Sequence, residues 1–185
     1  MTAAETVDAA LRGPVLVFGS LPPAGRDLDL LARPNQYAEI VSTLTAEGFL
    51  QKRTVWSRFG DCRAEVVDLV LASTLGLPAA ELDALFADAI ALDGFRRLFR
   101  PSPEHGLLLL ARRVEARKRR VAERHLRKAE RITAEDPTSW RRAYSRADAW
   151  DVTDALRMLQ SGTTVDVALA PRAALECSKA PCRTV

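Results

Sequence analysis

Two aspartates alternate with two leucines in the segment DLDL at residues 27–30, and this alternation restricts the fold more than any other feature of the chain. A period of two is typical of a β-strand, in which residues i and i+2 point to the same face. Asp27 and Asp29 should therefore project side by side. Two like charges beside apolar neighbours destabilise a fold unless a positive group lies between them. A bound metal ion would be one such group.

The first half of the chain predicts a mixture of strands and helices. The apolar run VLVF at residues 15–18 fits a short buried strand, because Gly and Pro bound it on both sides. Pro34 is expected to end the second strand, Asn35 to cap the next helix, and Gly48 to end that helix. The predicted elements are helices over residues 3–12 and 36–48 and strands over residues 15–18, 26–32, 49–59 and 64–72. Their order predicts a small mixed sheet with flanking helices, an α/β (α+β) fold.

The second half of the chain is predicted to be helical. Pro78 favours a helix start within residues 74–99, and a long helix is expected from about Glu104 to Ile132. Two shorter helices are expected over about residues 138–147 and 151–160. The chain is therefore divided into a strand-containing unit over residues 1–76, a helical unit over residues 77–162 and a flexible tail over residues 163–185.

Composition narrows the class of protein. With 185 residues, 48% of them hydrophobic and 28% charged, the chain has the composition of an ordinary globular protein. The N-terminal segment MTAAETVDAALRGP carries acidic residues and lacks the apolar core of a signal peptide. The apolar run GLLLLA at residues 106–111 is too short to span a bilayer. These observations predict a cytoplasmic protein without a membrane partner.

The cysteines and histidines do not form a recognisable site in the sequence. Three cysteines, Cys62, Cys177 and Cys182, fit a reducing compartment. Cys177 and Cys182 could bind a metal ion or form a disulfide, but two ligands do not make a zinc site, and ordinary thiols in a mobile tail are the favoured interpretation. His105 and His125 lie twenty residues apart with no Ser or Cys partner in view, so no His-based metal site is predicted.

A third acid, Asp68, lies inside the apolar run VVDLV of the last predicted strand. A carboxylate is costly in a buried strand, and three of them on neighbouring strands would repel one another. Mg²⁺ removes this conflict, because it binds hard oxygen ligands and accepts phosphate oxygens in its shell. Glu65 is a weaker candidate, since it should point to the opposite face of the strand. The competing interpretation is a set of solvated or salt-bridged acids.

The turn after the first strand gives a second indication of a phosphate-binding site. Gly19 allows the backbone to approach a phosphate closely, and Ser20 offers a hydroxyl and an N–H group. The segments VFGS and DLDLL and, about forty residues later, VVDLV together resemble the signature of the nucleotidyltransferase superfamily with the polymerase-β-type catalytic fold. The resemblance covers roughly residues 14–72.

This resemblance implies transfer of a nucleoside monophosphate, most simply AMP from ATP, to a hydroxyl or phosphate acceptor, with Mg²⁺ or Mn²⁺ as cofactor. It implies that Asp27 and Asp29 bind the metal, that Asp68 completes a second metal site and helps to deprotonate the acceptor, and that Gly19 and Ser20 contact the phosphates of the nucleotide. Only LPPAGR separates Ser20 from Asp27, a shorter segment than is usual in the family. A protein of the same fold that binds or regulates, antitoxin-like or as a partner subunit, remains the alternative.

Positive charge is concentrated at residues 112–131. This segment holds ten Lys or Arg and three Glu, a net charge of +7, whereas the whole chain carries +3. It indicates a surface for a nucleoside triphosphate, tRNA or another anionic acceptor; the alternative is a solvated helix face with local ion pairs. Arg124 and Lys128 are the residues expected to bind the β- and γ-phosphates. Few aromatic residues interleave this run, so it does not predict stacking of single-stranded bases.

Overall fold

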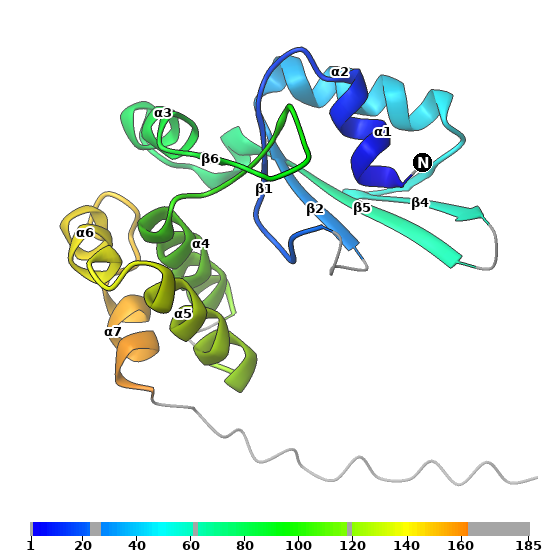
Figure 1. The fold of residues 1–185 in the computed structure, drawn as a ribbon. Coiled ribbons are helices and arrows are strands. Elements are labelled where there is room, and N and C mark those ends of the chain that lie inside the picture. The colour runs from blue at the N-terminus through cyan, green and yellow to red at the C-terminus, as the bar shows by residue number, and fades with distance from the viewer. Residues whose placement is uncertain (1, 23–26, 61–62, 118–119, 163–185) are drawn as a thin grey trace, which may run out of the picture.

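The computed structural model describes residues 2–22, 27–60, 63–117 and 120–162. Its strands are β1 (Val15–Val17), β2 (Asp27–Ala32), β3 (Leu50–Lys52), β4 (Val55–Gly60), β5 (Arg63–Leu71), β6 (Ile90–Ala91) and β7 (Leu98–Arg100). They form one sheet in the order β3-β4-β5-β2-β1-β7-β6 (Figure 1). The β2–β5 and β1–β7 pairs are parallel and the others antiparallel, so the predicted mixed sheet is confirmed.

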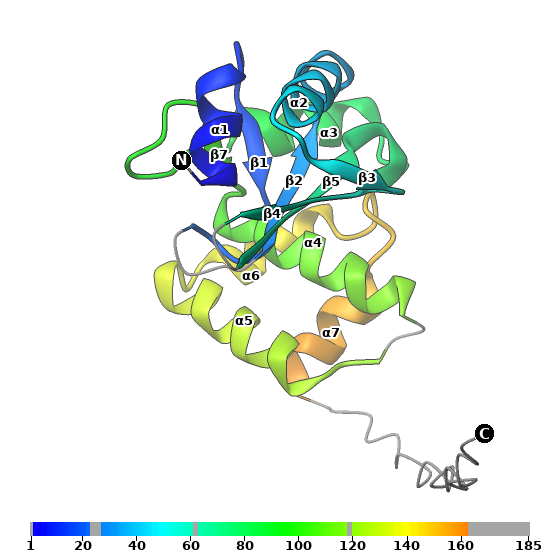
Figure 2. The same ribbon diagram turned by 90° about the vertical axis from the view of Figure 1, so that its right-hand side faces the viewer.

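Helices cover both faces of this sheet. They are α1 (Ala3–Ala10), α2 (Pro34–Ala46), α3 (Ala79–Ala87), α4 (Pro103–Ala116), α5 (Glu123–Glu135), α6 (Ser139–Arg146) and α7 (Thr153–Ser161), with a 3₁₀ turn at Ala72–Leu75. Helices α1 and α2 lie on one face, and α4 to α7 form a separate layer below the other (Figures 1 and 2). Alternation along β1 divides the core accordingly, because Val15 and Val17 pack towards α1 and α2 while Leu16 packs towards the α4–α7 layer.

The start of α2 differs from the prediction. The helix begins at Pro34, and Arg33 rather than Asn35 is the N-cap residue. Proline suits the first helical turn, since its missing N–H has no partner there in any case. Gly48 does follow the helix end with a φ of +76°, as expected for a glycine that terminates a helix.

The strand predicted over residues 49–59 is two strands. β3 and β4 form a hairpin whose turn contains Arg53 with a φ of +61°. The turn lies within the polar run at residues 51–54, which contains none of the Gly, Asn or Pro residues that usually mark a turn.

Residues 90–100 also differ from the prediction, because they contribute strands rather than helix. β7 pairs with β1, so the sheet receives two strands from beyond residue 76. The carboxylate of Asp8 on α1 holds this segment by accepting hydrogen bonds from the backbone N–H groups of Arg96, Arg97 and Leu98. This contact joins residues about ninety positions apart, which no local pattern can reveal.

The long helix expected from Glu104 to Ile132 is wrong. α4 ends at Ala116 and α5 begins at Glu123, and the two helices pack against each other. A continuous helix would place like charges four positions apart, at Arg113 and Arg117 and at Arg120 and Arg124, and such pairs disfavour a helix. The break allows α5 to turn back beneath the sheet.

In the described ranges, none of the helices combines the length and the apolar composition that crossing a bilayer requires. Cys62, Cys177 and Cys182 lie outside the described residues, as does the predicted tail, so their predictions stay untested.

Candidate functional site

The aspartates on β2 and β5 lie next to each other on the sheet face that looks towards α4 and α5. Asp29 is the direct partner of Asp68 in the parallel β2–β5 ladder, and paired residues on neighbouring strands lie about 4.8 Å apart along the hydrogen-bonding direction. Asp27 points to the same face, two residues earlier on β2, and is exposed. The intervening Leu28 and the following Leu30 are buried on the opposite face. The three carboxylates are therefore neighbours on one face.

Glu65 lies on the other face, as predicted. Its carboxylate accepts a hydrogen bond from the backbone N–H of Ala3 on α1 and pairs with Arg58 at 2.6 Å. It is thus already engaged in the packing of α1 and is separated from Asp68 by the sheet.

Gly19 and Asp29 are in direct contact. A Cβ atom built on Gly19 would lie 1.6 Å from Oδ2 of Asp29 and 2.5 Å from its Cγ. The backbone N–H of Phe18 donates to the carbonyl oxygen of Asp29 at 3.1 Å, which fixes the strand end beside the carboxylate. Only glycine can occupy position 19 while Asp29 keeps this position, so the predicted Gly19 turn and the predicted acid belong to one site.

The surroundings of Asp29 disfavour the charged form of its carboxylate. Burial is the main cause that raises its pKa, and the neighbouring charges of Asp68 and then Asp27 raise it further. Arg113 and Lys128 oppose this rise but do not reverse it. The two cations therefore offset only part of the repulsion between the carboxylates.

Helix α5 places Lys128 at this site. Its Nζ donates to the carbonyl oxygen of Phe18 at 3.0 Å and more weakly to that of Gly19 at 3.4 Å. Burial lowers the pKa of Lys128, and the charge of Arg113 lowers it further, whereas Asp29 raises it. Lys128, one of the two residues expected to bind the phosphates, thus lies beside the turn that contacts Asp29.

Two other predicted residues lie further out. Arg124 is exposed one helical turn before Lys128 on α5, and Ser20 is exposed directly after Gly19. Part of the turn that follows Ser20, residues 23–26, lies outside the described residues. Neither residue is placed against Asp29 or Asp68 by a hydrogen bond within the described ranges.

The carboxylate group fits a hard divalent cation. Oδ1 of Asp68 is buried and has no hydrogen-bond partner among the residues that the structure describes. An unpaired buried carboxylate oxygen is costly, and a cation bound between Asp29 and Asp68 would satisfy it and relieve their repulsion. Three carboxylates are also the donor set that Mg²⁺ and Mn²⁺ prefer.

Arg113 joins the site although sequence reasoning did not single it out. It comes from α4, whereas Lys128 comes from α5, and the break between the two helices brings both next to Asp29. A continuous helix would have placed these residues, fifteen positions apart, more than four turns from each other. Arg113 could not be predicted as a site residue without the break between α4 and α5.

Cations also surround His125, which is only 4% exposed. The backbone N–H of Ala122 donates to its Nδ1 at 3.2 Å, so the neutral ring carries its proton on Nε2. Burial lowers the pKa of His125, and so do four neighbouring cations: Arg124, Arg117, Arg113 and Lys128. The ends of α4 and α5 therefore gather like charges around a neutral ring.

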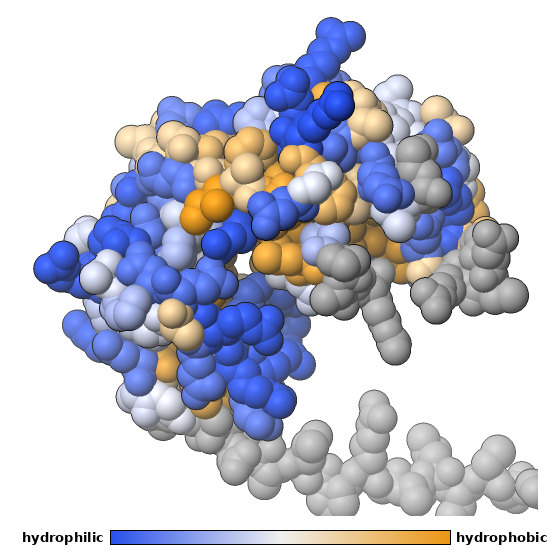
Figure 3. All heavy atoms as spheres, in the orientation of Figure 1, coloured by the Kyte–Doolittle hydropathy of each residue, from blue (hydrophilic) through white to orange (hydrophobic). Residues whose placement is uncertain are grey.

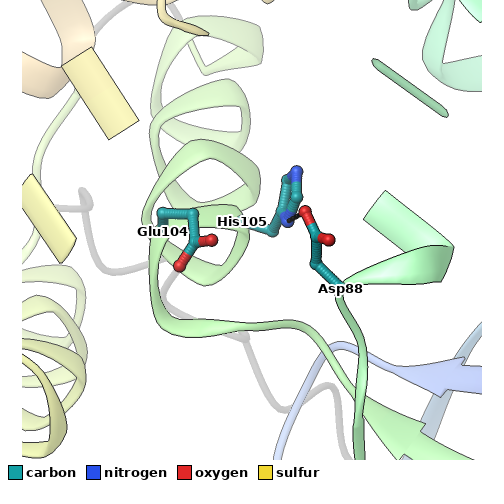
Figure 4. A group of neighbouring side chains, drawn as sticks. All are labelled: Asp88, Glu104 and His105. Carbon is teal, nitrogen blue, oxygen red and sulfur yellow. Dashed lines mark ion pairs between the residues drawn. The ribbon is translucent and has the colours of Figure 1, made fainter. Parts of the chain in front are cut away.

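A second group of possible metal ligands lies on the far side of α4. Donor atoms of Asp88, Glu104 and His105 lie within 4.8 Å of one another (Figure 4). Each member already has a polar neighbour: Arg142 pairs with Glu104 at 3.0 Å, Arg146 lies 3.8 Å from Asp88, and the Ser102 hydroxyl lies 2.9 Å from Nδ1 of His105. Nε2 of His105 is buried without a hydrogen-bond partner among the residues that the structure describes. These contacts explain the cluster as part of the packing between helices.

Comparison with models of known protein families, with curated proteins and with solved structures gives no match to this chain.

Proposed function

We propose that the protein is a metal-dependent nucleotidyltransferase that moves a nucleoside monophosphate, most simply AMP from ATP, onto a hydroxyl or phosphate acceptor. The observation that carries this proposal is the pairing of Asp29 with Asp68 on adjacent parallel strands, with Asp27 on the same face. One oxygen of Asp68 has no hydrogen-bond partner in the part of the chain that the structure describes. Arg113 and Lys128 offset only part of the charge of this carboxylate pair, so a bound cation would stabilise it further. A triphosphate donor would place such a reaction in the cytoplasm.

Asp27, Asp29 and Asp68 would hold Mg²⁺ or Mn²⁺. The bound ions would neutralise the triphosphate and lower the pKa of the attacking hydroxyl. The acceptor oxygen forms a bond to the α-phosphorus while the bond from that phosphorus to the β-phosphate bridging oxygen breaks, so that pyrophosphate leaves with this electron pair. The proton of the acceptor hydroxyl passes to the carboxylate of Asp68 and then to water. The backbone at Gly19 and Ser20 would approach the phosphates closely.

Lys128 has two roles in this proposal. It holds the Gly19 backbone through its hydrogen bonds to Phe18 and Gly19. It also supplies positive charge beside the carboxylates, where the β- and γ-phosphates would lie. Arg124, one turn away and exposed, would add charge at the outer end of the triphosphate.

One observation favours the second function, a regulatory protein that binds without transfer. Lys128 and Arg113 already offset part of the Asp29 charge, so this carboxylate can exist without a metal ion. On this interpretation the surface would serve a partner protein, and nucleotide binding would not require divalent metal.

The deciding experiment incubates the purified chain with each α-labelled nucleoside triphosphate, Mg²⁺ or Mn²⁺, and a mixture of cellular RNA, protein and metabolites. Transfer of label that is lost in Asp27→Ala/Asp29→Ala and kept in Asp93→Ala supports the enzyme. Asp93 is a suitable control because it is an exposed acid in the β6–β7 turn. Absence of both transfer and metal-dependent nucleotide binding would leave the regulatory protein as the better account.

A further inference from the structure

Two unlike surfaces flank the carboxylates. On one side is the basic surface, defined as Arg113, Arg117, Arg124, Lys128 and Arg131. On the other is the open sheet face, defined as Leu50, Val55, Phe59 and Val66. Figure 3 shows hydrophobic atoms on the underside of the sheet across an open space from the hydrophilic helical layer.

The open sheet face belongs to the same side of the sheet as the carboxylates. Val55 is the strand partner of Asp68, and Val66 is the strand partner of Asp27. Leu50 on β3 lies opposite Ser57, which in turn lies opposite Val66. Partners across a ladder point to the same face, so these apolar residues extend from the carboxylates to the β3 edge.

Two of the four apolar residues on the open sheet face are unusually exposed, and Val55 and Val66 are half-buried. Phe59 is 84% exposed and Leu50 is 75% exposed. The α4–α7 layer packs on the other half of the same face, against Leu16, Leu31 and Phe18. Apolar residues that remain uncovered beside a functional site indicate a binding surface.

The basic surface is continuous with the same site. Lys128 donates to the backbone at Phe18 and Gly19, and Arg124 and Arg131 lie one turn to either side of it on the same side of α5. Arg117 at the end of α4 and Arg124 at the start of α5 both lower the pKa of His125 through their charge, as Arg113 and Lys128 do. The arginines of the group are exposed. Cations that crowd together on two helices repel one another, and an anionic partner relieves that repulsion.

We propose, on the basis of the function proposed above, that the acceptor is the 3′ end of a single-stranded nucleic acid, with its phosphates on the basic surface and its terminal bases on the open sheet face. A triphosphate needs only the cations nearest the carboxylates, whereas the basic surface continues along both helices. A single strand has phosphates on one side and unstacked bases on the other, which matches the two flanking surfaces. The 3′ hydroxyl then lies beside Asp29 and Asp68.

This arrangement also supplies the aromatic residue that the basic segment lacks. Phe59 comes from the β4–β5 hairpin, far from residues 112–131 in the sequence, and its exposed ring can stack on a base. Folding places Phe59 on the sheet face that carries the carboxylates, with the basic surface on the other side of them.

The first test measures binding of fluorescent 12-nucleotide single-stranded RNA and DNA to the full chain in EDTA, so that neither metal nor nucleotide takes part. We expect Phe59→Ala to weaken binding at least about fivefold, and Ile90→Ala, at the other end of the sheet, to leave it unchanged. Arg117→Ala/Arg131→Ala should reduce the slope of log K against log salt by about 1.4, since each phosphate contact contributes about 0.7. Arg12→Ala, on α1's side of the sheet, is the control.

Further arms separate this inference from the proposed function. Label transfer to a 3′-hydroxyl strand and not to a 3′-deoxy strand supports the inference, and the RNA and DNA arms identify the acceptor sugar. Transfer to a metabolite or a protein, without strand binding, overturns the inference and leaves the proposed function intact. Strand binding without transfer to any acceptor overturns both. Equal binding of duplex DNA with no effect of Phe59→Ala would indicate a general polyanion surface and would also overturn the inference.

Discussion

The Asp29 carboxylate occupies the space beside Gly19 that the side chain of any other residue would need, with Oδ2 only 1.6 Å from the position of a Cβ atom. The two residues come from β2 and from the turn after β1, so this contact links the turn to the acidic strand. A substitution at either residue should therefore displace the other.

Gly19→Ala is expected to displace the Asp29 side chain, and overpacking of this kind costs about 1–3 kcal/mol. Chemical denaturation would measure the loss, and the proposed transfer activity should fall with it. The cost should be smaller in an Asp29→Ala background, where Oδ2 and Cγ are gone. Gly106→Ala is the control, because its added Cβ would meet only the flexible end of Ile132 at 3.3 Å. Equal costs in both backgrounds would contradict the contact.

Asp29→Asn should stabilise the protein at neutral pH without divalent metal. The folded-state pKa of Asp29 is raised, so ionisation is easier in the unfolded chain, and stability is lost as the pH rises from the ordinary value of 3.8 through the raised folded value. The denaturation midpoint of Asp29→Asn should exceed that of the wild type at pH 7, and the gap should close near pH 3.8. A variant less stable than the wild type at pH 7 would refute this electrostatic account.

Divalent metal should make the wild type more stable than Asp29→Asn. Mg²⁺ or Mn²⁺ bound between the carboxylates stabilises the folded chain by about 2.7 kcal/mol at a hundredfold excess over Kd. Thermal melts of the wild type should shift upward with metal and return after EDTA. Asp68→Asn should show no shift, whereas Asp93→Ala should behave as the wild type. A shift of equal size in Asp68→Asn would place the metal elsewhere.

Lys128→Ala should affect the proposed reaction much more than Arg124→Ala. Lys128 makes charge-assisted hydrogen bonds to the backbone at Phe18 and Gly19, and loss of such bonds costs about 10- to 100-fold in kcat/KM. Arg124 is exposed and should cost less than about threefold. Steady-state kinetics with the preferred nucleotide would measure both. Equal effects would mean that Lys128 does not position the turn.

Asp136 offers a prediction away from the site. Hydrogen bonds from Arg142 and Thr138 lower its pKa to about 2. A carboxylate with a lowered folded pKa stabilises the fold above its ordinary value of 3.8 and loses that contribution as the pH falls to about 2. Asp136→Asn should therefore be less stable than the wild type at pH 7, and the difference should vanish near pH 2. Urea denaturation at several pH values would measure it, and a constant difference would contradict the assignment.

Strong local patterns predicted much of the fold. The alternation along DLDL specified the face of Asp27 and Asp29, and the apolar run around Asp68 specified its strand, because burial on one face leaves a period of two. The same reasoning placed Glu65 on the opposite face. The β3–β4 turn was not predicted, because Arg53 adopts its positive φ in a polar run that lacks the usual turn residues Gly, Asn and Pro.

Long-range contacts were beyond such reasoning. β7 is short, and it is a strand because Asp8 and β1 hold it, not because of its own propensity. For the site, the sequence suggested the Asp29–Asp68 pair and Lys128, but the approach of Arg113 depends on the break between α4 and α5. The placement of Phe59 and of the basic residues on either side of the carboxylates also depends on the fold.

The parallel pairing of β1 with β7 has a consequence for biosynthesis. β1 is complete after Val17, yet one of its two neighbours is not made until Arg100 leaves the ribosome. Until then the nascent chain exposes an unsatisfied strand edge next to Val15, Leu16 and Val17, the kind of edge that pairs with other chains. A fragment ending at residue 76 should therefore aggregate rather than fold, and the growing chain would need shielding until its last strand arrives.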